Sequence, residues 1–120
     1  MEKVRTFRDL KVWQRAHELV LAVYAVTKQF PDDERYGITS QIRRSVSSIA
    51  TNIVEGCKRN GKKEFLYFLN ISDTSVEETK YHLLLSRDLG YLANSEYERL
   101  LDLCNQVGRM LNALQKSLEE

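Results

Sequence analysis

The sequence predicts an all-α fold, an antiparallel up-and-down four-helix bundle that occupies residues 1–120 as a single domain. Three observations predict it. The 120 residues leave room for one domain. Apolar residues recur every three or four positions through most of the chain, as they do on helices that bury one face. The five Gly and the single Pro are too few for the turns of a β-sandwich or barrel.

The first helix is expected over about Asp9–Gln29, where two rows of apolar residues run along one side. The first row is Trp13, Ala16, Val20, Val23, Thr27 and Phe30, and the second is Val12, Leu19 and Val26. Together they make an apolar face wider than one bundle seam requires. Pro31 and the acidic residues behind it end this helix, because proline cannot continue it.

The second helix is expected to begin near Thr39 or Ser40, because either hydroxyl can cap a free backbone N–H. Its buried stripe is Ile42, Val46, Ile49, Ala50 and Ile53. We expect Arg43 and Arg44 to point to solvent and the helix to stop at Gly56.

The third helix is expected over about Lys62–Asp88, and Gly90 marks its C-terminal end. Small residues on its core side would let another helix approach closely. They are Ser72, Ser75 and Thr79. The segment Ser95–Glu98 is typical of a capping box, which predicts the start of a fourth helix. Its seam for bundle packing is Tyr97, Leu100, Cys104, Val107, Leu111, Leu114 and Leu118.

The segment between the second and third helices has the spacing of a phosphate-binding loop at Gly56, Gly61 and Lys62. Lys63 stands where Ser or Thr would bind Mg²⁺, and a helix precedes the loop where the motif needs a strand, so nucleotide hydrolysis is not expected. The cations here are Lys58, Arg59, Lys62 and Lys63. They form either a solvated loop or a contact with a phosphate backbone.

No enzyme, metal or cofactor is expected. His17 and His82 lack the Glu-x-x-His spacing of di-iron bundles. Cys57 is flanked by Lys58 and Arg59, which would lower its thiol pKa, but no His lies near it to act as a base. We therefore interpret it as an incidental thiol.

Four polar residues flank apolar stripes of the second and third helices. They are Asn52, Glu55, Ser75 and Glu78. A structural polar cluster that fixes helix register is favoured over a ligand site.

The formal net charge of +1 conceals an asymmetry. Residues 1–63 carry 13 Lys and Arg against 7 Asp and Glu, whereas residues 64–120 carry 5 against 10. Such a chain can meet an anionic partner through one end, or copies of itself head to tail. The absence of a long apolar run and of a secretory signal at the N-terminus, together with only two Cys, predicts a cytoplasmic protein with no membrane contact.

Five segments, taken in order, carry a resemblance to a known family. They are Phe7–Trp13, Arg35–Arg44, Ile49–Gly56, Lys63–Phe65 and Leu89–Leu92. Over about residues 5–115 the chain resembles the 23S rRNA intervening-sequence proteins, four-helix bundles whose genes often lie inside insertions in bacterial large-subunit rRNA genes. It departs from their usual pattern at Thr74–Thr79 and at Cys57 and Asn60, which does not threaten the fold.

The resemblance implies a bacterial, non-catalytic homopentamer, and the wide apolar face of the first helix is consistent with an extra buried surface. Accessory proteins of diversity-generating retroelements are similar to this family, and their pentameric barrels engage nucleic acid and a reverse transcriptase. We therefore expect association with structured RNA or another nucleic acid through a basic surface, with a reverse transcriptase as a further implied partner. The residues expected to bind are Arg43, Arg44, Lys58, Arg59, Lys62 and Lys63. The alternative is a ring-forming protein-interaction scaffold with no nucleic-acid role.

Overall fold

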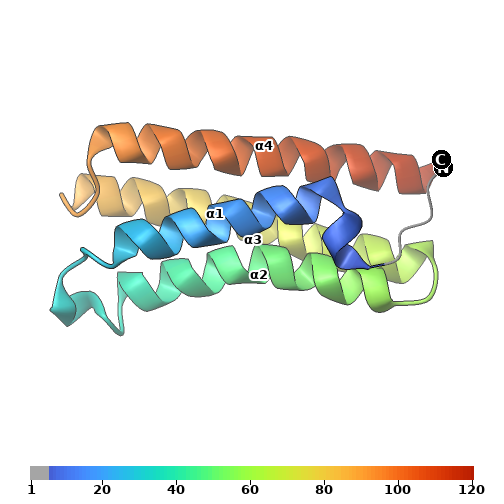
Figure 1. The fold of residues 1–120 in the computed structure, drawn as a ribbon, viewed down its shortest axis with the longest axis horizontal. Helices are drawn as coiled ribbons and strands as arrows, with labels where there is room; N and C mark the ends of the chain where they lie inside the picture. Colours follow the sequence, from blue (N-terminus) through green and yellow to red (C-terminus); the bar gives the residue numbers. More distant parts are fainter. Residues whose placement is uncertain (1–5) are drawn as a thin grey trace.

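Four α-helices run alternately up and down in the computed structural model, which describes residues 6–120 (Figure 1). Two short 3-10 helices, η1 and η2, precede the first and second of them. The elements are η1 Phe7–Asp9, α1 Lys11–Thr27, η2 Asp32–Glu34, α2 Ile38–Lys58, α3 Lys62–Asp88 and α4 Asn94–Glu119. The predicted all-helical four-helix bundle is confirmed. The first five residues of the predicted domain lie outside the described part.

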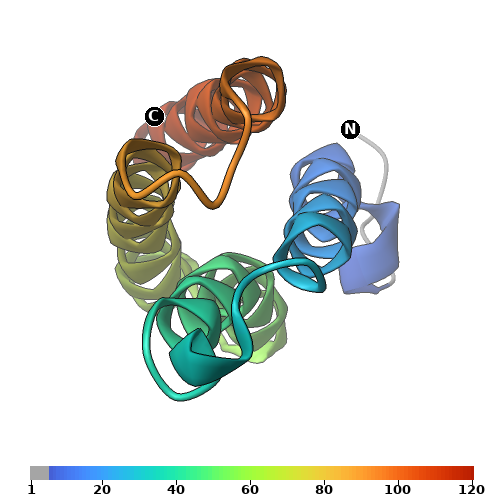
Figure 2. The same cartoon turned by 90° about the vertical axis from the view of Figure 1, so that its left-hand side faces the viewer.

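Each helix packs against the next one in the chain, and α4 packs back against α1 (Figure 2). The bundle measures 45 × 24 × 19 Å. One buried apolar side of every helix faces the common core, as the spacing of apolar residues predicts. The most deeply buried large side chains are Leu19, Ile42, Ile49, Ile53, Leu69, Leu83, Leu100 and Leu111.

The most extensive contact is between α2 and α3. Hydroxyl groups line it: the oxygens of Ser45 and Thr79 lie 2.9 Å apart, and Ser72 donates to the carbonyl of Ile49 at 2.7 Å. Short side chains let the two backbones approach closely. Because these hydroxyls are hydrogen-bonded, burying them leaves none of them without a partner, and the free-energy cost of an unpaired buried polar group is avoided.

Gly56 closes this contact near the end of α2. A Cβ added there would lie 2.8 Å from Cδ1 of Phe65 and 3.2 Å from Cβ of Phe68, both on the first two turns of α3. Only a residue without a side chain allows the two helix ends to meet so closely. Gly61, with φ of 94°, then supplies the left-handed backbone that turns the chain into α3.

The structure corrects both ends of the first predicted helix and both ends of the second. The first helix begins at Lys11, two residues late, because η1 occupies residues 7–9, and it ends at Thr27. The second begins at Ile38, so Thr39 and Ser40 are not its N-cap. Instead, the N–H of Ile38 donates to Oε1 of Glu34 at 3.3 Å. This helix also continues past Gly56 to Lys58, whereas Lys62–Asp88 is the third helix as predicted.

The predicted capping box of the fourth helix is wrong. The helix starts at Asn94, after Ala93, and no side chain caps it. A capping box forms instead at η1, where the N–H of Arg8 donates to Oγ1 of Thr6 at 3.0 Å and the N–H of Thr6 donates to Oδ2 of Asp9 at 3.1 Å.

Each of the two apolar rows of α1 contains both buried and partly buried residues. Leu19 and Val23 are fully buried, whereas Trp13, Val20 and Val26 are only partly buried. The edges of the wide apolar face of α1 are therefore only partly covered within one chain. Leu21, which helical periodicity places on the opposite side of α1, is 58% exposed.

Replacement of Leu111 by Ala should lower the free energy of unfolding by about 2–5 kcal/mol, because Leu111 is fully buried in the seam of α4. Chemical denaturation measures this loss. Leu89→Ala is the matched control, since its exposed side chain should change stability by less than about 0.5 kcal/mol. Equal stability of Leu111→Ala and the native protein would contradict the core assignment.

Candidate nucleic-acid interface

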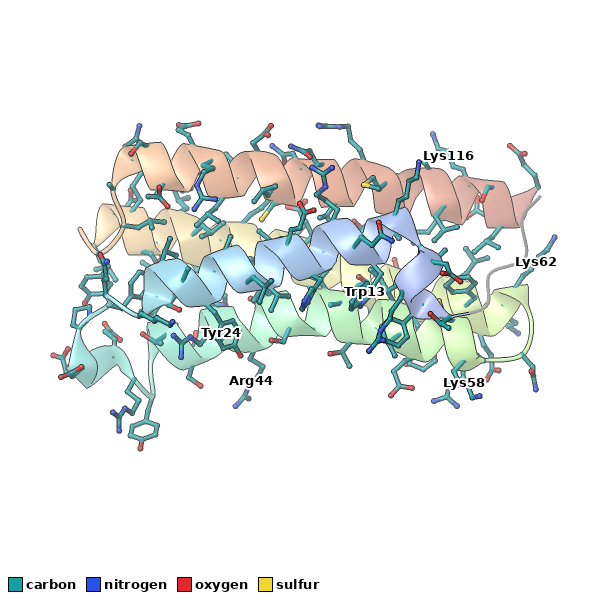
Figure 3. The ribbon with its side chains drawn as sticks, in the orientation of Figure 1. Trp13, Tyr24, Arg44, Lys58, Lys62 and Lys116 are labelled. Atoms are coloured by element: carbon teal, nitrogen blue, oxygen red, sulfur yellow. The ribbon has the colours of Figure 1, made fainter. Side chains whose placement is uncertain are left out.

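Positive charge gathers along α2 and the segments on either side of it. Residues 35–63 contain seven cations, which are Arg35, Arg43, Arg44, Lys58, Arg59, Lys62 and Lys63, and one acid, Glu55. Figure 3 shows Arg44 and Lys58 on the same edge of the bundle and Lys62 near its end, with Lys116 of α4 on the opposite edge. We call this region, residues 35–63, the basic surface.

A groove of about 680 Å³ lies at the N-terminal half of the basic surface. It is lined by Tyr24, Arg35, Tyr36, Thr39, Ser40, Arg43, Arg44, Ser47, Ser48, Thr51 and Asn52. Among these described lining residues, none is acidic. The groove therefore offers guanidinium groups, hydroxyls and two phenol rings to a ligand, which suits an anion.

Arg43 and Arg44 are adjacent in sequence but differ in their surroundings. Arg43 donates from Nε to Oγ1 of Thr27 at 2.8 Å, and its Cζ lies 4.6 Å from the ring centroid of Tyr24. Arg43 thus links the end of α1 to α2. The prediction that it points to solvent is wrong, because its side chain is held by these contacts and is only partly exposed. Arg44 is exposed, and its side chain makes no hydrogen bond or ion pair with any residue between 6 and 120.

The other four predicted cations surround the turn between α2 and α3. Lys58, Lys62 and Lys63 are exposed. Arg59 is partly neutralised, because its Nη2 lies 3.6 Å from Oε2 of Glu55 and its Cζ lies 5.0 Å from the ring centroid of Phe68.

The six predicted binding residues therefore fall into two groups. Arg44 and Lys58 are 14 positions apart on one helix, which places their backbones about 21 Å apart. Arg44 and Lys58 lie on the same edge of the bundle and Lys62 lies near its end (Figure 3), but the structure does not bring the two groups into a single pocket.

The predicted polar cluster is also divided. Asn52 and Ser75 both bond Ser48, the first from Nδ2 to the hydroxyl at 3.0 Å and the second between hydroxyls at 2.9 Å. Glu55 instead faces Arg59, and Glu78 has 58% of its side chain exposed, with Oε2 3.8 Å from Nε2 of His82. The sequence does not single out Ser48 as the centre of the cluster, because a Ser on a helix surface gives no signal of its own.

The pKa of the Cys57 thiol is shifted in the direction opposite to the one that its sequence neighbours suggest. Partial burial raises the pKa of Cys57, so the expectation that Lys58 and Arg59 lower it is wrong. Burial also raises the pKa of Cys104, to about 12. Both thiols are protonated at neutral pH, and neither is an activated nucleophile.

Residues 6–120 contain no group of three or more His, Cys, Asp or Glu side chains that could hold a metal ion. No helix in the same range is both long and apolar enough to cross a membrane.

Arg35, Tyr36 and Tyr24 line the groove but were missed by the sequence analysis. Tyr36 follows Arg35 in the short link between η2 and α2, and its ring is 88% exposed. The available signal was the aromatic and cationic pair Arg35–Tyr36 within the segment that carries the family resemblance.

Comparisons with known proteins identify related sequences and folds. Residues 8–113 match the family described as 23S rRNA-intervening sequence protein. A crystal structure of a protein with unknown function from the S23 ribosomal protein family of Bacteroides thetaiotaomicron matches with a TM-score of 0.81 and 24% sequence identity. The match covers 88% of this chain and 98% of that one, and at this identity it shows a shared fold. None of the curated proteins compared matches the sequence.

Arg43→Ala should destabilise the protein by about 1–2 kcal/mol, because it removes a hydrogen bond to the buried Thr27 hydroxyl and the contact with the Tyr24 ring. Arg44→Ala should change stability by less than about 0.5 kcal/mol, because Arg44 is exposed. Urea denaturation compares them. Equal effects would contradict the different surroundings of the two arginines.

Proposed function

The chain belongs to the 23S rRNA-intervening sequence protein family, and from that premise we propose that it is a non-catalytic protein that binds RNA through its basic surface. The single observation that carries this proposal is the charge of residues 35–63, where seven cations accompany one acid. Figure 3 places Arg44 and Lys58 on one edge of the bundle and Lys62 near its end. Phosphates supply most of the electrostatic attraction between nucleic acids and proteins.

The arrangement of the cations supports contact with an extended polyanion. Arg44 in the groove and Lys58 at the turn between α2 and α3 lie about 21 Å apart along the helix, a distance that one short RNA strand can bridge. Each group alone offers few contacts, and linked weak contacts strengthen one another when a single ligand reaches both. Because phosphates carry no sequence information, this surface should bind RNA with little sequence selectivity.

Replacement of Lys58, Arg59, Lys62 and Lys63 by Ser should weaken binding to structured RNA and flatten its salt dependence. For double-stranded RNA regions each lost phosphate contact should reduce the slope of log K against log salt by about 0.9. Fluorescence anisotropy across a salt series measures both changes, and circular dichroism checks that the helices remain.

The matched control is Arg109→Ser with Lys116→Ser, two exposed cations of α4 on the acidic half of the chain. It should leave affinity and slope unchanged. If the native protein binds no RNA or DNA at low salt, the nucleic-acid role is wrong. If the quadruple variant binds as tightly as the native protein, the turn between α2 and α3 is not part of the interface.

We also propose assembly into a homopentamer, which the family resemblance implies and exposed apolar side chains support. Leu21 on α1 is 58% exposed, and Tyr67 and Tyr81 on α3 are 63% and 58% exposed. Large apolar groups in water favour burial against another surface.

The second candidate function is a protein-interaction scaffold. In it, the ring forms through these side chains and has no nucleic-acid role. The reverse-transcriptase partner and the cytoplasmic location stay predictions.

Multi-angle light scattering should give a mass five times the 14.0 kDa of the chain. Leu21→Glu should shift the mass toward the monomer, because it places a charge in the proposed contact, whereas Leu21→Met should not. A monomeric native protein at tens of micromolar would contradict the assembly and remove the scaffold alternative with it.

A further inference from the structure

The groove beside α2 combines an exposed aromatic ring with arginines. Arginines alone would attract phosphates, so the ring indicates a further contact. Tyr36 is 88% exposed, the highest value among the large hydrophobic side chains that the structure describes as exposed. It lies between Arg35 and the start of α2 and lines the groove. An exposed aromatic ring beside cations is the usual platform on which an unpaired base stacks.

Arg43 gives the groove a guanidinium that is already oriented. Its Nε donates to Thr27 and its Nη2 to the carbonyl of Tyr24 at 3.4 Å, while the Tyr24 ring packs against it. A guanidinium has five N–H donors, so three remain for a ligand. Because the side chain is already fixed, binding through these donors loses little conformational entropy.

Hydroxyl groups continue from the arginines along the outer side of α2. Ser40, Ser47 and Thr51 line the groove at helical spacing, and within the described chain their hydroxyls form no side-chain hydrogen bond. Oγ1 of Thr39 is buried and likewise has no partner there. From Ser40 to Thr51 the helix rises about 17 Å, about the length of five stacked nucleotides.

We propose that this groove binds an unpaired RNA segment, with one base stacked on Tyr36, phosphates on Arg43 and Arg44, and ribose hydroxyls on the Ser and Thr row. The proposal rests on the proposed function and assigns its ligand at this site. Hydroxyl side chains both donate and accept, which matches the ribose 2′-OH that DNA lacks. In a duplex the bases are stacked on one another, so none is free for the ring of Tyr36.

Fluorescence anisotropy with the full chain tests the proposal on three labelled probes of one sequence: a single-stranded RNA of about ten nucleotides, its blunt RNA duplex and the DNA strand. The single-stranded RNA should bind most tightly. Tyr36→Ala should weaken its binding about 5-fold to 150-fold, whereas Tyr36→Phe, which keeps the ring, should bind like the native protein. Leu89→Ala is the control, because Leu89 is 49% exposed, does not line the groove and is not one of the proposed contacts between copies.

The salt dependence separates stacking from phosphate contact. Tyr36→Ala should leave the slope of log K against log salt unchanged, whereas Arg44→Gln should reduce it by about 0.7. Native affinity in Tyr36→Ala, or duplex RNA bound as tightly as the single strand, would overturn this proposal and leave the proposed function intact. Equal affinity for the DNA strand would overturn the ribose contacts. Failure of the native protein to bind any probe would overturn the proposed function itself.

Discussion

The close contact between α2 and α3 is the constraint on which the rest of the bundle depends. Its hydroxyl pairs form only at one register, because Ser45 must meet Thr79 while Ser72 meets the carbonyl of Ile49. A shift by one residue would bury hydroxyls without partners, which costs more than the bonds contribute. Once α3 and the core occupy the inner side of α2, its remaining side must face solvent. The position of the basic surface is therefore a consequence of the packing.

Different helix contacts bury the apolar area and fix the register of the helices. The α4 seam is apolar, with Leu100, Val107 and Leu111 fully buried, and contributes stability through the area that it removes from water. Apolar contacts alone tolerate several arrangements of similar energy. The polar contact between α2 and α3 selects one arrangement, because hydrogen bonds have narrow distance and angle requirements.

The sequence predicts the bundle and the bounds of α3 because apolar periodicity extends over many residues. Helix starts are harder to predict from sequence, because several side chains can accept a hydrogen bond from the same backbone N–H. Glu34, four residues before Ile38, takes the role that the pattern assigns to Thr39 or Ser40. At the candidate site, no pattern distinguishes Arg43 from Arg44. The difference comes from α1. Its last residue, Thr27, lies 16 positions before Arg43 and accepts a hydrogen bond from Arg43 but not from Arg44.

The location of the exposed apolar groups makes assembly and RNA binding compatible. Leu21 lies on α1 and Tyr81 on α3, and neither lines the groove on α2. Basic surfaces of two copies repel each other, so a contact between copies that brings these surfaces together is disfavoured. Contacts through the apolar groups avoid that repulsion and leave Arg44 and the turn between α2 and α3 open to solvent. A ring built in this way would present one basic surface per copy, and an RNA long enough to touch several of them would be held by their combined contacts.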